Sequence, residues 1–274
     1  MHSLHCKLSN SLWQALEAKH HATGDSLNHI VAQALSDYLQ VEHSTLFQVS
    51  TTGALVEGLY QGEVSIGDLK QHGDFGLGTF NNLDGEMVAL EGKFYQARAD
   101  SELHEVGNDV LSPFAVVTHF VPEIKVELTD CQNLETLMVT IDRMRCSENI
   151  FFAIRVDGEF DYVRTRVVCK QQEGVRLVDA TATQAEFEFH NVTGTLVGFW
   201  TPEYVKSINV PGYHLHFLTL DRRVGGHLLD CRAKRLRIQM QHEGNFRMSL
   251  PETSGFLQAD FTIDTSAELL KAEK

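Results

Sequence analysis

The sequence changes character near residue 45, and this change restricts the possible folds more than any other feature does. After that point, short apolar runs are separated by polar or glycine-containing segments, which is the pattern of strands. Helical periodicity is limited to three short segments, so the sequence predicts an α+β domain, β-rich with few helices, built on mixed or antiparallel sheet. Strands are expected at residues 46–49, 87–90, 94–97, 114–120, 151–156, 163–168, 187–190, 195–200, 213–220, 226–231 and 236–240, and helices at 66–71, 131–144 and 264–273.

The composition is that of a globular protein with its own hydrophobic core. Apolar residues form 43% of the 274-residue chain, and a chain of this length buries enough surface to fold without disulfides. The five cysteines are widely spaced and include no CxxC pair, so we expect reduced, mostly buried thiols in a cytoplasmic protein. The sequence shows no secretory signal and no stretch of about 18 apolar residues, so no membrane association is expected.

Residues 1–44 are expected to form a separate segment with a strand–helix–helix pattern. Residues 3–8 alternate polar and apolar side chains, as in a short strand. Ser9 is a candidate N-cap for a first helix, and Gly24 is a candidate left-handed C-cap that ends it. A second helix is expected to begin at Asp25 or Ser26 and to carry one wide apolar stripe.

This segment, HCKLSNSLWQALEAKHHATGDSLNHIVAQALSDYL, resembles the ribbon-helix-helix family, whose members form intertwined dimers and often bind DNA through paired strands. Residues 1–45 carry only two lysines against four acidic residues, and the whole chain has a net charge of −14. Because negative charge repels phosphate backbones, we predict that the segment dimerises without binding nucleic acid. The alternative is a plain helical hairpin that packs on the main domain.

The sharpest local signal in the second part of the chain is the segment GYHLHFLTLDRRVGGHLLDC. His214 and His216 share one face of a strand, because alternate side chains point to the same side. A turn at residues 222–226 lets His227 begin a returning strand and supply a third imidazole. Three neutral imidazoles can bind Zn²⁺ and leave a position open for substrate, and iron or manganese can use the same set. The alternative is that these are ordinary strand histidines.

Two other segments contain groups that could act on a substrate. The glycines of HGDFGLG indicate a loop, and Asp84-Gly85 indicates a hairpin turn. Glu86 follows that turn, where it is either a solvated strand end or a carboxyl group aimed into a site. Arg164 and Arg166 share a face of another strand, and an arginine buried there needs an anion, either a side-chain carboxylate or a substrate carboxylate.

Residues 46–274 are similar to the bacterial α-acetolactate decarboxylase family. The strings HGDFGLGTFNNLDGE and GYHLHF carry most of the resemblance, and SPFAVVTHF, GTLVGFWTPEY and LPETSGFLQADF add to it. The resemblance implies an enzyme that converts 2-acetolactate to acetoin and CO₂ with bound zinc, and that forms a homodimer. The chain is therefore expected to comprise residues 1–44 and a metal-binding catalytic domain over residues 45–274.

The same resemblance implies which residues act. By their positions in the motifs, the zinc ligands are His214, His216 and His227. The other implied site residues are Thr79, Glu86, Arg166 and a glutamate near the C-terminus, for which Glu273 is the best match and Glu268 is the alternative.

These residue types suit the decarboxylation of a β-keto acid. Zinc is expected to act as a Lewis acid that stabilises the enediolate formed as CO₂ leaves. Arg166 would orient the substrate carboxylate, and Thr79 would position the substrate or Glu86. Protonated Glu86, or a water that it holds, would deliver a proton to one face and so set the handedness of the product. Glu273 would close the site or join the proton relay.

Two other functions remain open on the residues alone. A His-x-His pair on a strand also resembles the start of a cupin metal site, but residues 217–220 stand where that pattern usually has a glutamate. A ligand-sensing regulator would combine the metal site with DNA binding by residues 1–44, and the acidic balance of that segment disfavours it.

Overall fold

The computed structural model describes residues 5–39 and 44–273, and the chain divides into two compact units, residues 1–44 and 45–274. In the first unit, α1 (Asn10–Thr23) and α2 (Leu27–Leu39) are the expected helices. The hydroxyl of Ser9 accepts a hydrogen bond from the Leu12 N–H, and Gly24 has the left-handed backbone expected of a C-cap. Ser26 caps α2, because its hydroxyl accepts a hydrogen bond from the His29 N–H.

The strand expected before α1 is not seen in the described residues. Residues 5–9 have no regular structure, and residues 1–4 lie outside the described part. No residue of α1 is buried, and Leu12 and Trp13 are 55% and 44% exposed. The two expected helices are present, but the resemblance to the ribbon-helix-helix family is not confirmed.

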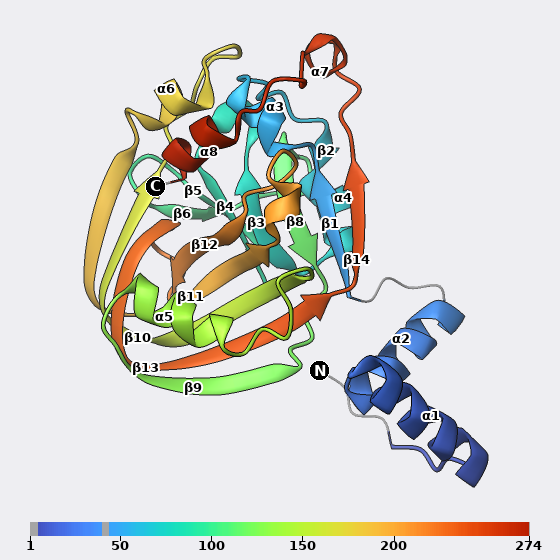
Figure 1. The fold of residues 1–274 in the computed structure, drawn as a ribbon. Coiled ribbons are helices and arrows are strands. Elements are labelled where there is room, and N and C mark those ends of the chain that lie inside the picture. The colour runs from blue at the N-terminus through green and yellow to red at the C-terminus, as the bar shows by residue number, and fades with distance from the viewer. Residues whose placement is uncertain (1–4, 40–43, 274) are drawn as a thin grey trace. The chain divides into compact units, whose positions relative to one another are not determined.

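The second unit contains a mixed seven-stranded sheet (Figure 1). Its first strand along the chain pairs in parallel with the last one, and the other neighbours are antiparallel. The order across the sheet is β14 (Asn245–Ser249), β1 (Thr45–Val49), β8 (Phe114–Thr118), β3 (Phe75–Thr79), β4 (Glu86–Leu90), β5 (Lys93–Ala97) and β6 (Leu103–Glu105).

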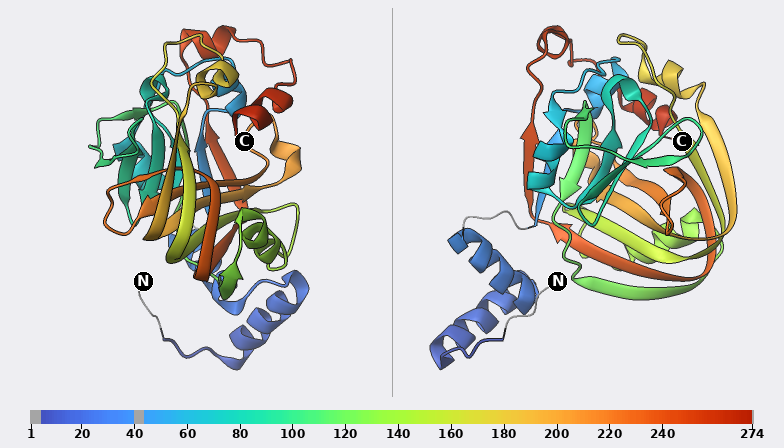
Figure 2. Two further views of the ribbon diagram at one scale, coloured as in Figure 1. Left: turned by 90° about the vertical axis from the view of Figure 1, so that its left-hand side faces the viewer. Right: turned by 180° about the vertical axis from the view of Figure 1, so that it is seen from behind.

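A second, antiparallel sheet is built from long curved strands, which Figures 1 and 2 show side by side. Its strands are β9 (Ile124–Cys131), β10 (Phe151–Val167), β11 (Ala185–Thr201), β12 (Gly212–Thr219) and β13 (Gly225–Glu243). β10 pairs with β11 and β13, and β12 also pairs with β11 and β13, so these four strands close into a ring at one end. β9 pairs with β13 beyond that ring. The predicted α+β class with mixed and antiparallel sheet is confirmed.

Several expected elements differ in detail. Six of the expected strands are halves of β10, β11 and β13. Polar, half-exposed side chains interrupt the apolar pattern in the middle of these strands, but the backbone pairing continues through them. The glycine-rich segment expected as a loop is strand β3, because the backbones of its neighbours approach too closely for larger side chains. The helix expected from residue 131 begins three residues later as α5 (Leu134–Asp142), since Cys131 ends β9.

The remaining elements are short. They are α3 (Thr52–Val56), β2 (Val64–Ser65), α4 (Ile66–His72), β7 (Leu111–Ser112), α6 (Leu177–Thr181), α7 (Ser254–Gln258), α8 (Ser266–Ala272) and two 3₁₀ turns, Asn81–Leu83 and Glu203–Val205. No helix among the described residues is long and apolar enough to cross a bilayer. All five cysteines are free, but only Cys131 and Cys231 are buried, so the expectation of mostly buried thiols is wrong.

The largest hydrophobic cluster lies between the two sheets. It combines Leu77 and Val88 of the seven-stranded sheet with Val197 and Phe199 of β11. The ring of Phe75 meets that of Phe199 edge to face at 6.1 Å. Since β12 and β13 also contact β4, polar side chains on the inner faces of these strands are held in a dry layer between the sheets.

Candidate metal centre and active-site cavity

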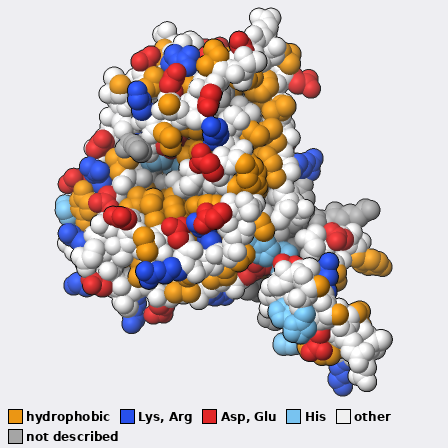
Figure 3. Space-filling model, viewed as in Figure 1, with side chains coloured by type: hydrophobic (Ala, Val, Ile, Leu, Met, Phe, Trp, Pro, Cys, Tyr) orange, Lys and Arg blue, Asp and Glu red, His pale blue; other side chains and the backbone are white. Residues whose placement is uncertain are grey.

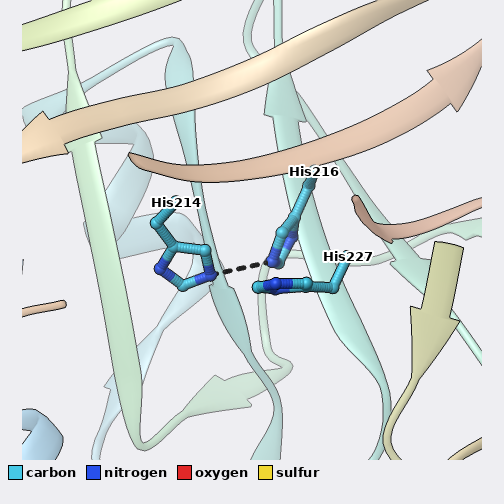
Figure 4. Close-up of side chains that lie close together, drawn as sticks. All are labelled: His214, His216 and His227. Carbon is cyan, nitrogen blue, oxygen red and sulfur yellow. Dashed lines mark hydrogen bonds between the residues drawn. The ribbon is translucent and has the colours of Figure 1, made fainter. Parts of the chain in front are cut away.

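The three histidines predicted as metal ligands converge on one point between the sheets (Figure 4). His214 and His216 alternate along β12, and His216 lies directly opposite His227 of β13. One ligand nitrogen from each ring lies within 4.8 Å of the others, and the Nε2 atoms of His214 and His216 are 3.2 Å apart. Pairing of two neighbouring strands therefore suffices to assemble the cluster.

The surroundings keep these imidazoles neutral, which is the form that binds a metal. Burial, together with the positive charge of Arg166, lowers the pKa of His214 to about 3. Burial also lowers the pKa values of His216 and His227 well below the ordinary value. The Nδ1–H of His216 donates to the backbone carbonyl of Met87 over 2.8 Å, so its Nε2 carries a lone pair that faces the other two rings.

This donor set fits a divalent metal ion. Two nitrogens bound at about 2.0–2.1 Å to one tetrahedral Zn²⁺ lie about 3.3 Å apart, close to the separation of the two Nε2 atoms on β12. The same two Nε2 atoms share one hydrogen bond, and Nδ1 of buried His214 has no partner. The described residues thus form a group that could bind a metal through His214, His216 and His227.

Arg166 projects from β10 into the same space, and it lies directly opposite His227 in the β10–β13 pairing. Its Nη1 donates to the amide oxygen of Gln184 over 2.9 Å, and its Nη2 lies 3.5 Å from a carboxylate oxygen of Glu273. Its Nε has no partner although the side chain is only 4% exposed. A buried guanidinium with a free donor can accept an anion. Arg164, its neighbour on the same face, is half-buried and does not line the cavity.

Glu86 and Thr79 meet across the β3–β4 hairpin, where they are directly paired. The hydroxyl of Thr79 donates to the carbonyl of Gly85 over 2.7 Å, which ties the turn to the strand. Gly85 has a φ of +87°, so the expected turn is confirmed at the residue that needs glycine. A carboxylate oxygen of Glu86 lies 3.6 Å from Nε2 of His216.

Burial raises the pKa of Glu86 to about 7, partly opposed by the positive charge of Arg166 and assisted by the negative charge of Glu273. Its other oxygen accepts a long hydrogen bond of 3.4 Å from the Val168 N–H. The carboxyl group therefore exchanges its proton near neutral pH, as a general acid requires. Of the two interpretations of Glu86 from sequence, the structure supports the buried carboxyl group over the solvated strand end.

The C-terminal helix brings Glu273 to the cluster. This residue caps α8, and its carboxylate lies 3.6 Å from Nε2 of His227 and 3.8 Å from Nε2 of His214. Burial raises its pKa, and the charge of Arg166 opposes the shift. Glu268 points elsewhere and pairs with Arg176. Of the two glutamates considered, Glu273 is the one beside the histidines.

One cavity of about 40 Å³, measured as space for the centres of water-sized molecules, is lined by Thr79, Glu86, Arg166, Glu273 and two of the three histidines, His214 and His227. A histidine is visible in a hollow of this face in Figure 3. The apolar wall of the cavity comes from both sheets and from α3, α6 and α8. The lining residues are Thr52, Leu55, Gly78, Thr79, Leu83, Glu86, Phe114, Arg166, Val168, Leu177, Thr181, Val210, His214, His227, Ala272 and Glu273.

Two groups that support the site were missed from sequence: Gln184, which holds Arg166, and the Met87 carbonyl, which holds His216. Neither has a sequence signal, since one is a lone amide and the other is backbone.

Comparisons with known proteins agree on one family. The family model described as Alpha-acetolactate decarboxylase matches residues 46–263. An alpha-acetolactate decarboxylase of Methanosarcina mazei is 45% identical over 84% of this chain and 80% of its own length. One from Bacillus licheniformis is 43% identical over 83% of this chain and 91% of its own length. The crystal structure of alpha-acetolactate decarboxylase from Bacillus subtilis strain 168 is similar with a TM-score of 0.81 at 38% identity, covering 84% of this chain and 99% of that one.

Proposed function

This chain belongs to the alpha-acetolactate decarboxylase family, and from that premise we propose that it converts 2-acetolactate to acetoin and CO₂ with zinc held by His214, His216 and His227. One observation carries the proposal: three neutral imidazoles, a buried guanidinium and two buried carboxyl groups converge on one small cavity. That set contains a metal site, a carboxylate binder and proton carriers, which are the groups that decarboxylation of a β-keto acid requires.

The reaction breaks the bond between C2 and the carboxylate carbon of the substrate. The electron pair of that bond moves toward the neighbouring ketone, CO₂ departs, and C2 then takes up one proton. Zinc held by His214, His216 and His227 would supply a Lewis acid for the negative charge that develops as CO₂ leaves. The chain's own residues bind the carboxylate, hold the proton and keep the cavity dry.

Arg166 is proposed to orient the carboxylate that leaves. Its buried Nε donor has no partner in the protein, and its ion pair with Glu273 is long at 3.5 Å, so capacity for an anion remains. The guanidinium stays protonated at neutral pH, which makes it a positioning group and not a proton donor.

Glu86 is proposed to deliver the proton to C2. Its pKa of about 7 leaves a large protonated fraction at neutral pH, and its place on one side of the histidine cluster restricts delivery to one face of the substrate. Thr79 is proposed to position Glu86 by tying Gly85 to β3, and Glu273 is proposed to close the cavity and share the proton relay.

We also propose that the protein is a cytoplasmic homodimer in which residues 1–44 pair with the same segment of a second chain. The support is the surface of the two helices: α1 buries no residue, and Leu12, Trp13 and Leu39 are 55%, 44% and 61% exposed. A short pair of helices that exposes several large apolar side chains is stabilised when a partner covers them. Five free cysteines suit a reducing compartment.

The proposal is tested by measuring acetoin formation from racemic 2-acetolactate with three samples: protein as purified, protein treated with a chelator, and chelated protein refilled with Zn²⁺. Activity that disappears on chelation and returns with zinc is the expected result. A folded, zinc-loaded sample without activity would contradict the proposed reaction. Activity that survives complete removal of the metal would contradict the zinc dependence alone.

A further inference from the structure

Helix α8 carries Glu273 but is too short to hold itself in place. It has seven residues, whereas isolated helices need about 12–15 residues to be even marginally stable in water. The position of the Glu273 backbone therefore depends on what docks α8 on the rest of the unit, while its carboxylate also contacts Arg166. In Figure 1, α8 lies beside α3 and α6, and contacts between these helices agree with that view.

Two kinds of contact dock the helix. Leu269 and Ala272 are 2% and 1% exposed and belong to the core cluster between the sheets. On the outer side, Arg176 donates from Nε and Nη2 to one carboxylate oxygen of Glu268, over 3.1 and 2.8 Å. Its Nη1 donates to Glu57 over 3.0 Å.

The guanidinium of Arg176 therefore joins three helices. Arg176 is the N-cap residue of α6, Glu57 is the C-cap residue of α3, and Glu268 lies in the first turn of α8. The apolar contacts of Leu269 and Ala272 decide which face of α8 meets the core, but they leave small rotations about the helix axis possible. The planar guanidinium is directional, so it fixes that rotation.

We propose that Arg176 is a positioning residue for the reaction, which acts through Glu268 and α8 to hold the Glu273 carboxylate beside His227. Arg176 does not line the cavity, so this role is separate from that of Arg166. Glu268 and Glu273 are five residues apart, or about 140° around the helix, so release of the first lets the second rotate away from the cluster. The inference rests on the proposed role of Glu273.

The size of the effect follows from exposure. The side chains of Arg176 and Glu268 are 38% and 39% exposed, and pairs in such surroundings contribute little individually. We therefore expect Arg176→Gln to lower kcat by about 2–10-fold, with little change in KM and none in zinc content.

The decisive experiment is a double-mutant cycle with Glu273. In the wild-type background Arg176→Gln lowers kcat, whereas in a Glu273→Gln background it has no further effect, because the group that it positions is already lost. Arg176→Lys restores part of kcat, since a single ammonium keeps the charge but cannot reach both carboxylates with fixed geometry. High salt lowers kcat of the wild type but not of Arg176→Gln.

Lys93→Gln is the matched control. It removes an exposed ion pair with Glu105, 3.0 Å long, on strands outside the cavity, and is expected to leave kcat unchanged. If Arg176→Gln fails to fold, Glu268→Gln tests the same contact from the helix side.

Three results would overturn the inference. The first is an unchanged kcat in both Arg176→Gln and Glu268→Gln. The second is that Arg176→Gln lowers kcat as much in the Glu273→Gln background as in the wild type. The third is that Lys93→Gln lowers kcat as much as Arg176→Gln does. In each case the wild type remains active, so the proposed function stands. Loss of acetoin formation in the zinc-loaded wild type itself would instead overturn the proposed function, and this inference with it.

Discussion

The site has two halves that are held in place in different ways. His214, His216, His227 and Arg166 stand on strands whose backbones pair with neighbours on both sides, so their positions follow from a continuous hydrogen-bonded sheet. Glu273 stands on a seven-residue helix that is docked by two apolar side chains and an exposed ion-pair network. The histidine cluster is therefore part of the strand framework, whereas the position of Glu273 depends on side-chain contacts.

The largest effect is expected from breaking the strand-borne half. His216→Ala removes the ligand whose orientation the Met87 carbonyl fixes, so we expect loss of bound zinc and a fall of acetoin formation to background. Zinc content and turnover measured on the same folded sample check this. His104→Ala, on β6 and outside the cavity, serves as the control, and a variant at His216 that keeps both zinc and activity would contradict the ligand assignment.

The proposed proton donor, Glu86, also stands on a strand, in the β3–β4 hairpin. Glu86→Gln keeps the shape of the side chain but cannot carry the proton, so we expect zinc to remain bound and kcat to fall by about 10²–10⁴-fold. Steady-state kinetics with metal analysis provide the measurement. Turnover equal to that of the wild type would remove Glu86 from the proton step.

Replacement of Glu273, which stands at the end of α8, is expected to lower kcat less than replacement of Glu86. Glu273→Gln is expected to retain zinc and to lower kcat by less than about 100-fold, below the usual range for a direct proton donor. If instead this variant loses its zinc, Glu273 belongs to the metal site and the division between the two halves is wrong.

The stability of the strand framework can be tested separately from the site. Glu243, at the end of β13, is 2% exposed, and burial together with the negative charge of Glu123 raises its pKa well above the ordinary value. Its contribution to stability is present below the unfolded-state pKa and is lost as pH rises toward the folded-state pKa.

Glu243→Gln should therefore raise the free energy of unfolding at pH 8 by more than about 1 kcal/mol, with a smaller gain at pH 4 and no change in kcat. Denaturant unfolding at the two pH values measures this. A variant less stable than the wild type at pH 8 would show that the carboxylate is stabilised in the fold.

Removal of the first unit is expected to have little effect on turnover. Deletion of residues 1–44 leaves every cavity residue in place, so kcat should change by less than about twofold. The mass in solution should decrease beyond the loss of the segment itself if this unit pairs two chains. Light scattering on both forms measures it, and an unchanged association state would reject the dimerisation proposal.

The hairpin-borne and strand-borne residues could be predicted because their signals are local. Alternation along residues 213–220 placed His214 and His216 on one face, and the turn before His227 brought back the third ring. Asp84-Gly85 marked the turn that sets Glu86. The prediction of a loop at HGDFGLG was wrong. Its glycines do not form a loop; they allow the backbone of β8 to approach closely.

Local patterns were enough to predict the change of structure near residue 45, the β-rich class and the convergence of the three histidines, because alternation and turn chemistry act between residues close in the chain. Packing between distant segments placed Glu273, and not Glu268, beside the histidines, joined the halves of β10, β11 and β13, and brought Gln184 and the Met87 carbonyl to the site. Those choices depend on contacts between segments about 20 to more than 100 residues apart, and the packing of α8 and the two sheets sets such contacts.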